Sequence, residues 1–381
     1  MAYALKLRQF PTHPSYDLAF PRQAETLFEN RTRRTTPFHI RMHMAFEESG
    51  IAPKSVMRID HLATPPWELH SPTVDLSLTS IKKNDTSPDE FHSLALELIN
   101  QYIGHSAFYT DGSKTDAGGG CAFVCGDITR SFSLPAQATV FSSELMAIIK
   151  ALCFIDVCDS ALHVIFSDPL SSLLALRQFY PMNPLLQEIL LRITTLHQAG
   201  KTVKLCWIPS HVGIIGNEKA DAAAKRSALA PCLRRLPLPA KDFFSSVHKY
   251  IQKEWQTQWD NEWNNKLRKI KPHLGEWQSS SRRSRREEVI LCRLRVGHTL
   301  ATHRYLLCRE RKPRCQRCSA DLSVRHVLVS CPGYIRERTC FFGQHGRRLS
   351  LRALLGDESP YINDVFGFLT EIGFKIVFTP G

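Results

Sequence analysis

The sequence lacks any long uninterrupted apolar run. No apolar stretch in its 381 residues approaches the roughly 20 residues that a membrane-spanning helix requires. Residues 1–17 also lack the continuous apolar segment and small-residue cleavage site of a secretory signal. These absences predict an intracellular protein, in the nucleus or the cytoplasm, without a membrane partner.

An acidic excess is lacking as well, and the basic excess is confined to one part of the chain. The net charge is +13. Residues 1–104 carry 11 Lys/Arg and 12 Asp/Glu, and residues 105–230 carry 10 of each, whereas residues 231–381 carry 28 and 14. Because one segment holds the whole positive excess, we expect a polyanionic partner there, most simply a nucleic acid.

The composition is typical of a globular chain rather than a disordered one, and the lack of export signals favours reduced cysteines over a disulfide scaffold. Hydrophobic residues make up 43% and charged residues 22%, as in ordinary globular proteins. In a reducing compartment the 12 cysteines are buried thiols or metal ligands rather than disulfides. The length suits two or three domains.

Residues 1–104 are predicted to form a connector that is partly helical and partly extended. Nine prolines interrupt it. A helix is expected over residues 38–48 and an extended linker over residues 65–85. A further helix is expected over residues 87–103, where a Ser-Pro pair supplies an N-cap and a first helical residue.

Strand-like and helix-like patterns alternate through residues 105–230. The strands are predicted over residues 106–112, 121–126, 129–134, 163–168 and 203–208. The helices are predicted over residues 142–154, 171–179, 185–197 and 218–228. This order predicts an α/β domain with a mixed five-stranded sheet flanked by helices.

Four acidic residues occupy strand ends and helix starts in this domain. Asp111 and Asp168 end predicted strands, and Glu144 and Asp221 lie early in predicted helices. Taken singly, each has an ordinary role in a turn, at an N-cap or near a helix N-terminus. Gathered at one rim of a sheet they would repel one another, and divalent cations would relieve that repulsion. Carboxylate oxygens suit Mg²⁺ or Mn²⁺, and two such ions can promote phosphodiester hydrolysis.

The segments around these residues resemble those of type-1 ribonuclease H. YTDGS, SSELMAI, FSD and WIPSHVGIIGNEKADAAAK occur in that order. The resemblance implies a ribonuclease H-like fold and cleavage of the RNA strand of an RNA–DNA hybrid. It implies that Asp111, Glu144, Asp168 and Asp221 hold two Mg²⁺ or Mn²⁺ ions. It also implies that His211 acts near the departing product, through proton handling or ion release.

Three neighbouring residues complete the predicted site. Gly112 and Ser113 of the YTDGS segment are predicted to contact the nucleic acid. The resemblance also implies that the glycine-rich region of residues 116–120 approaches the RNA, which the family distinguishes from DNA by its 2′-hydroxyls. Glu218 matches a secondary acidic position of the family, or it is simply a solvent-facing helix start.

A cysteine-histidine cluster lies in the basic segment. Cys315, Cys318, His326 and Cys331 have the residue types and spacing of a small zinc site, spanning residues 315–331. The alternative is a set of unliganded thiols around a packed helix, and Cys308 and Cys340 are rival ligands. The cluster resembles the knuckle that follows the ribonuclease H domain in non-LTR retrotransposon polyproteins. That resemblance implies the C-terminal part of such a polyprotein, acting in reverse transcription.

The remainder of residues 231–381 is predicted to be a mostly helical, basic tail. Tryptophans at 255, 259 and 263 recur every four residues, which favours the core of a helical bundle over a base-stacking platform. The segment SSSRRSRRE favours RNA binding or a nuclear address, with a solvated lead-in to a helix over residues 287–295 as the alternative. The predicted basic contacts are Arg282, Arg283, Arg285, Arg286 and Arg317.

Three functions remain open at this point. The first is a metal-dependent endonuclease that cuts the RNA strand of hybrids. The second is a catalytically inactive remnant of a transposon protein that still binds nucleic acid. The third is a purely structural or interaction role, with the cysteine-histidine cluster as the working part.

Overall fold

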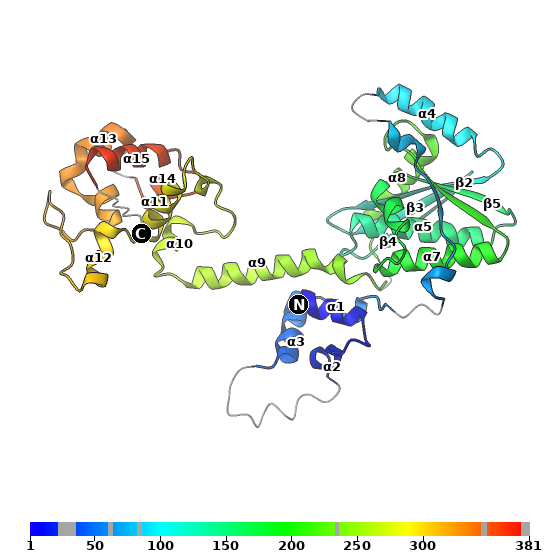
Figure 1. The fold of residues 1–381 in the computed structure, drawn as a ribbon, viewed down its shortest axis with the longest axis horizontal. Helices are drawn as coiled ribbons and strands as arrows, with labels where there is room; N and C mark the ends of the chain where they lie inside the picture. The colour runs from blue at the N-terminus through cyan, green and yellow to red at the C-terminus, as the bar shows by residue number, and fades with distance from the viewer. Residues whose placement is uncertain (22–35, 60–63, 82–85, 233–235, 344–348, 375–381) are drawn as a thin grey trace. The chain divides into compact units, whose positions relative to one another are not determined.

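The chain forms two compact units, Met1–Lys249 and Tyr250–Gly381. The structure is a computed structural model that describes residues 1–21, 36–59, 64–81, 86–232, 236–343 and 349–374 (Figure 1). Among these residues, every helix is too short or too polar to traverse a lipid bilayer.

A mixed six-stranded sheet is the framework of the first unit. Its order is β1-β6-β5-β2-β3-β4, with β2, β3 and β4 antiparallel and β2, β5, β6 and β1 parallel. The strands are β1 (Thr73–Asp75), β2 (Ser106–Lys114), β3 (Gly119–Cys125), β4 (Ile128–Leu134), β5 (Leu162–Ser167) and β6 (Thr202–Trp207). The α/β class and the mixed sheet are confirmed, and the five predicted strands lie within two residues of their predicted bounds.

Helices cover both faces of this sheet (Figure 1). One face packs in a large apolar core against α5 (Val140–Asp156), α6 (Leu170–Leu176) and α7 (Pro184–Gln198). The other face packs against α4 (Pro88–Asn100) and α8 (Ile215–Leu229). Ser87 caps α4, since its Oγ accepts from the Glu90 N–H at 3.2 Å, as the Ser-Pro pair predicts.

Strand β1 corrects the prediction of a five-stranded sheet. It lies in the segment expected to be an extended linker, and it pairs in parallel with β6 from Thr73↔Lys204 to Asp75↔Cys206. Tyr102 Oη donates to Asp75 Oδ2 at 2.7 Å, which ties this strand to the chain just after α4. Residues 82–85 of the predicted linker lie outside the described residues.

The other described residues of the segment 1–104 also pack into the first unit. Its helices are α1 (Ala2–Gln9), α2 (Tyr16–Ala19) and α3 (Phe38–Ser49), with short 3₁₀ turns η1 (Pro53–Ser55), η2 (Pro66–Glu68) and η3 (Ser77–Ser80). Leu5 and Phe46 share an apolar cluster with Leu134 at the end of β4. The same cluster contains Phe243, in the turn η4 (Ala240–Phe243). These residues therefore support one edge of the sheet.

Asp242 of η4 holds the first turn of α5. Its Oδ1 accepts hydrogen bonds from the hydroxyls of Thr139 and Ser142, at 2.9 Å each. Thr139 is also the N-cap of α5, because its Oγ1 accepts from the Ser142 N–H at 3.2 Å. The helix start that carries Glu144 is thus fixed from two sides.

Two glycines let helices approach the sheet closely. A Cβ on Gly112 would overlap the backbone of Ser143 and Glu144 at the start of α5. A Cβ on Gly120 would overlap the backbone of α8 at Ala224 and Ala228. Glycine is required at both positions because backbone, unlike a flexible side chain, cannot move aside cheaply.

We expect Gly120→Ala to destabilise the first unit by about 1–3 kcal/mol, the usual effect of overpacking, because α8 must shift away from β3. Urea-induced unfolding followed by circular dichroism measures it. Gly104→Ala is the matched control, since a Cβ there meets no atom within 4 Å. Equal midpoints for the two variants would contradict the close approach of α8.

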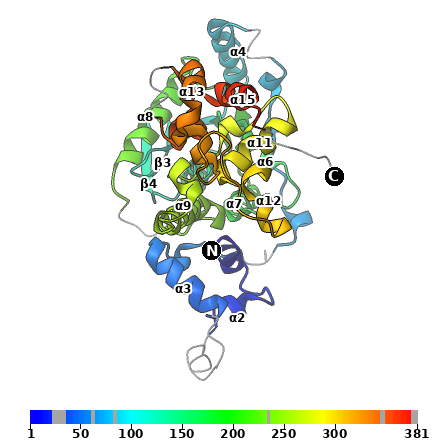
Figure 2. The ribbon, with the colours of Figure 1, turned by 90° about the vertical axis from the view of Figure 1, so that its left-hand side faces the viewer.

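The second unit is helical and has its own apolar core. Its elements are α10 (Lys266–Ile270), η5 (Gln278–Ser280), α11 (Arg285–Val296), α12 (Leu300–Cys308), a π-helical turn η6 (His326–Ser330), η7 (Pro332–Tyr334), α13 (Ile335–Phe342), α14 (Leu351–Leu355) and α15 (Ile362–Glu371). Helices α13 and α15 pack together (Figure 2). Phe368 is fully buried in this core. The predicted mostly helical C-terminal region is confirmed.

The tryptophan stretch is not the core of a bundle. Helix α9 (Phe244–Asn261) buries only Val247, while Trp255 and Trp263 are 58% and 76% exposed. Trp259 alone is anchored, by a hydrogen bond from its Nε1 to the Lys271 carbonyl at 2.8 Å. The expectation of a tryptophan core is therefore wrong for Trp255 and Trp263.

Candidate functional site

Strand register brings two of the predicted acids together. In the parallel pair β2–β5, Thr110 lies opposite Ser167, and their hydroxyls are joined by a hydrogen bond of 2.9 Å. An aspartate follows each of these two residues, Asp111 within β2 and Asp168 directly after the end of β5. The two carboxylates therefore lie side by side at the same edge of the sheet.

Helices contribute the other two acids. Glu144 lies in the second turn of α5, and one of its carboxylate oxygens lies within 4.8 Å of ligand atoms of Asp111 and Asp168. Asp221, in α8, forms a second group with Glu218 and His211, again within 4.8 Å. The charge of Asp221 still acts on Asp111, Glu144 and Asp168, so the two groups adjoin.

Proton affinity in this cluster is strongly raised. Burial, and then the charges of Asp168 and Asp221, raise the pKa of Asp111 to about 8. Burial, and then the charges of Asp111 and Asp168, raise the pKa of Glu144 to about 10. Burial also raises the pKa of Asp168. Without compensating positive charge, the site therefore favours protons on several of its carboxyls.

The donor set fits divalent cations. Glu144 Oε2 is buried and has no hydrogen-bond partner among the described residues. Asp111 and Glu144 are each only 6% exposed, so water cannot solvate their charges fully. Clustered, buried carboxylate oxygens are the ligands that Mg²⁺ and Mn²⁺ prefer. The residues that could hold such ions are Asp111, Glu144, Asp168 and Asp221.

Without metal, we expect the first unit to lose stability as pH rises. The folded pKa values of Asp111 and Glu144, about 8 and about 10, exceed their ordinary values of 3.8 and 4.5. Stability is therefore full below pH 4 and falls as pH rises toward these folded values, because the unfolded chain releases its protons first. In EDTA the Tm should drop by several degrees between pH 6 and pH 9, because each kcal/mol of lost unfolding free energy lowers the Tm by roughly 2–4 °C.

Magnesium should offset this loss, so the Tm increase on adding Mg²⁺ should grow with pH. Differential scanning fluorimetry in EDTA and in Mg²⁺ measures both trends. Asp127→Asn, at an exposed position before β4, is a control that should leave them unchanged. A pH-independent Tm increase in Mg²⁺ would argue against cation binding by these carboxyls.

A short loop between β6 and α8 carries His211. The side chain is exposed, and its backbone has φ of 57°, in the left-handed region. The positive charge of protonated His211 would lower the pKa of Asp168, so the ring lies near the acidic cluster. The structure thus brings His211 to the same edge of the sheet as the carboxylates.

Two residues of α8 were not anticipated from the sequence. Asn217 is buried, and its Nδ2 donates to Asp168 Oδ2 at 3.3 Å. Lys225 Nζ lies 2.7 Å from Asp221 Oδ2, forming an ion pair one turn along the helix. Only acidic residues and a histidine were predicted as members of this site from the sequence. Asn217 could have been predicted as well, because it directly precedes Glu218.

The predicted nucleic-acid contacts differ in accessibility. Gly112 is buried, and its backbone hydrogen-bonds to Glu144, whereas Ser113 is half-buried. Arg282 is largely occupied within the second unit, since it hydrogen-bonds to Asn363 and lies over the Phe366 ring. The other arginines predicted to contact nucleic acid are exposed, namely Arg283, Arg285, Arg286 and Arg317. All of these contacts stay predictions.

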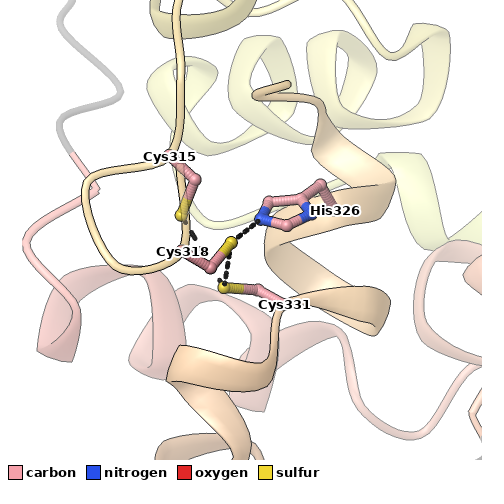
Figure 3. A group of neighbouring side chains, drawn as sticks. All are labelled: Cys315, Cys318, His326 and Cys331. Atoms are coloured by element: carbon pink, nitrogen blue, oxygen red, sulfur yellow. Dashed lines mark hydrogen bonds between the residues drawn. The ribbon is translucent and has the colours of Figure 1, made fainter. Parts of the chain in front are cut away.

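The cysteine-histidine cluster is assembled in the second unit (Figure 3). Cys315 and Cys318 lie on a loop, His326 begins the turn η6, and Cys331 follows it. The Sγ atom of Cys331 lies 3.7 Å from the Sγ atoms of both Cys315 and Cys318. His326 Nε2 lies 3.2 Å from Cys318 Sγ. The rival ligands Cys308 and Cys340 are exposed and are not part of this group.

The two sulfur–sulfur distances match those of a tetrahedral zinc site. Zn–S bonds of about 2.3 Å in a tetrahedron place sulfur atoms about 3.8 Å apart. Burial raises the pKa of Cys315, but backbone N–H groups and His326 outweigh it and lower the value to about 6, which favours a thiolate. Burial and the Cys315 sulfur raise the pKa of Cys331 to about 11. A cation could stabilise the second thiolate as well.

Comparison with known families identifies the first-unit domain. The RNase H family matches residues 104–229, which contain the four carboxylates, His211 and Asn217. No curated protein sequence matches the chain. Residues 104–229 are therefore an RNase H domain, and the residues on either side of it lie outside the match.

Proposed function

We propose that the RNase H domain at residues 104–229 hydrolyses the RNA strand of RNA–DNA hybrids by a two-metal mechanism. The observation that carries this proposal is the buried cluster of Asp111, Glu144 and Asp168, with Asp221 adjoining it. The acids lie within a domain whose family acts on such hybrids. Bound Mg²⁺ or Mn²⁺ ions would supply positive charge for the attacking and leaving oxygens.

The chain's own residues orient this site. Asn217 fixes the Asp168 carboxylate through its amide, and the Gly112 backbone hydrogen-bonds to Glu144. Lys225 pairs with Asp221 and is exposed enough to give way when a cation binds. His211 is exposed and lies near Glu218 and Asp221, where it would exchange a proton with the leaving product.

For the second unit we propose a structural zinc ion held by Cys315, Cys318, His326 and Cys331. Sulfur spacings of 3.7 Å favour this role. Exposed arginines around the cluster would add affinity for the phosphate backbone, so hybrid binding would weaken as salt increases. Such a nuclease with a basic tail suits reverse transcription in a retrotransposon, as the resemblance of its motifs suggests.

The test is cleavage of a hybrid labelled on either strand, in Mg²⁺, in Mn²⁺ and in EDTA. We expect the RNA strand to be cut only with metal present and the DNA strand to stay intact. Single-stranded RNA and duplex DNA are the matched substrates. Hybrid binding without cleavage in either metal, by protein that is folded, would instead identify an inactive binding remnant.

A further inference from the structure

Helix α4 lies upstream of the RNase H match but packs against the loop that carries His211. Ala95 and Leu98 of α4 share a buried apolar cluster with Ile208 and Ile214, which flank this loop on either side. Val212 lies against the same cluster. The loop is therefore supported by an element from outside the matched residues.

A hydrogen bond reinforces this packing. His92 Nδ1 lies 2.7 Å from the carbonyl oxygen of Val212, the residue that follows His211. Because a carbonyl only accepts, Nδ1 must carry the hydrogen. The bond is available to the Nδ1–H tautomer and to the protonated ring alike, so protonation of His92 does not break it.

The loop adopts a backbone that needs such support. His211 has φ of 57° and Gly213 has φ of 83°, so two of its residues are left-handed. A residue other than glycine costs about 1 kcal/mol or more in this region, and such a conformation persists only when its surroundings enforce it. Val212, which lies between these two residues in the sequence, accepts the hydrogen bond from His92.

We propose that His92 is a positioning residue for His211, and that α4 is thereby part of the active site. The His92–Val212 hydrogen bond holds the loop so that the His211 ring faces Glu218 and Asp221. This inference rests on the proposed nuclease function, because it assigns His92 a part in that reaction. It also gives a role to a segment that its sequence marks only as a helical connector.

Two variants separate the hydrogen bond from the volume of the ring. His92→Phe keeps an aromatic ring but loses the donor, and we expect kcat to fall about tenfold with KM unchanged, as misplacement of a catalytic group does. His92→Asn keeps an N–H donor near the Nδ1 position, and we expect it to retain most of the wild-type kcat. Glu97→Gln, at an exposed position of the same helix, is the control.

A double-mutant cycle tests whether His92 acts through His211. In a His211→Ala background, His92→Phe should change kcat by less than about twofold, since the group it positions is gone. If His92→Phe instead lowers kcat about tenfold both in the wild type and in the His211→Ala background, His92 has a merely structural role. A wild-type kcat for His92→Phe would overturn the proposal outright.

Hydrogen exchange supplies a readout that needs no activity. Amides of residues 210–214 should exchange faster in His92→Phe than in the wild type or in His92→Asn. Unchanged exchange would overturn the proposal. If the wild-type protein fails to cut any hybrid, the nuclease proposal fails, but the exchange measurement still decides whether His92 holds the loop.

Discussion

Asp111→Asn should abolish cleavage of the RNA strand while leaving the first unit folded. The amide keeps the size of the carboxyl but cannot supply an anionic ligand at the centre of the acidic cluster. Charge stabilisation by metal is worth several kcal/mol, so the rate should fall by at least about a thousandfold at 1.36 kcal/mol per tenfold change. The measurement is single-turnover cleavage of a hybrid at saturating Mg²⁺.

The same variant should be more stable than the wild type in EDTA at pH 8. Burial, and then the charges of Asp168 and Asp221, raise the pKa of Asp111, which means that its charge is unfavourable in the metal-free fold. Removing that charge relieves the repulsion, and it also shrinks the Tm increase caused by Mg²⁺. Cleavage lost together with a lower metal-free Tm would point to misfolding, and retained cleavage would remove Asp111 from the ligand set.

The framework of the RNase H domain could be predicted because local patterns determine it. Helix α5 differs from its predicted bounds by two residues at each end, and β5 differs by one. Apolar periodicity and capping residues act over a few residues and leave a readable signal. The clustering of Asp111 with Asp168 was also predictable, although β2 continues to Lys114, because both aspartates directly follow the last residue pair of the parallel β2–β5 ladder.

Other features depend on contacts between distant segments, and no local pattern encodes them. Strand β1 has three residues, and its pairing with β6, some 130 residues away, defines it. The tryptophans of α9 have helical spacing, but spacing alone does not supply a partner surface. His92 has no distinguishing neighbours in the sequence. Its relation to His211 appears only when α4 is folded onto the β6–α8 loop.

Removal of zinc should unfold the second unit and leave the first intact. Cys315 and Cys331 are almost completely buried, and η6 between their loops packs Val327 and Leu328 into the apolar core. Structural zinc contributes an apparent binding free energy of about 10–16 kcal/mol, which is folding free energy in such small units. We expect Cys331→Ser to lose bound zinc and most of the cooperative unfolding of residues 250–381.

Elemental analysis should find one zinc ion per wild-type chain and none in Cys331→Ser. Cys340→Ser is the matched control, since Cys340 is exposed and outside the cluster, so it should keep the metal and the unfolding transition. Cys331→Ser should still cleave the hybrid at low salt, because the catalytic residues lie in the first unit. Its cleavage should weaken steeply as salt rises, because the basic nucleic-acid contacts of the second unit are lost. Full folding of Cys331→Ser without metal would instead make the four residues an unliganded thiol cluster, since apolar packing alone would then hold the second unit.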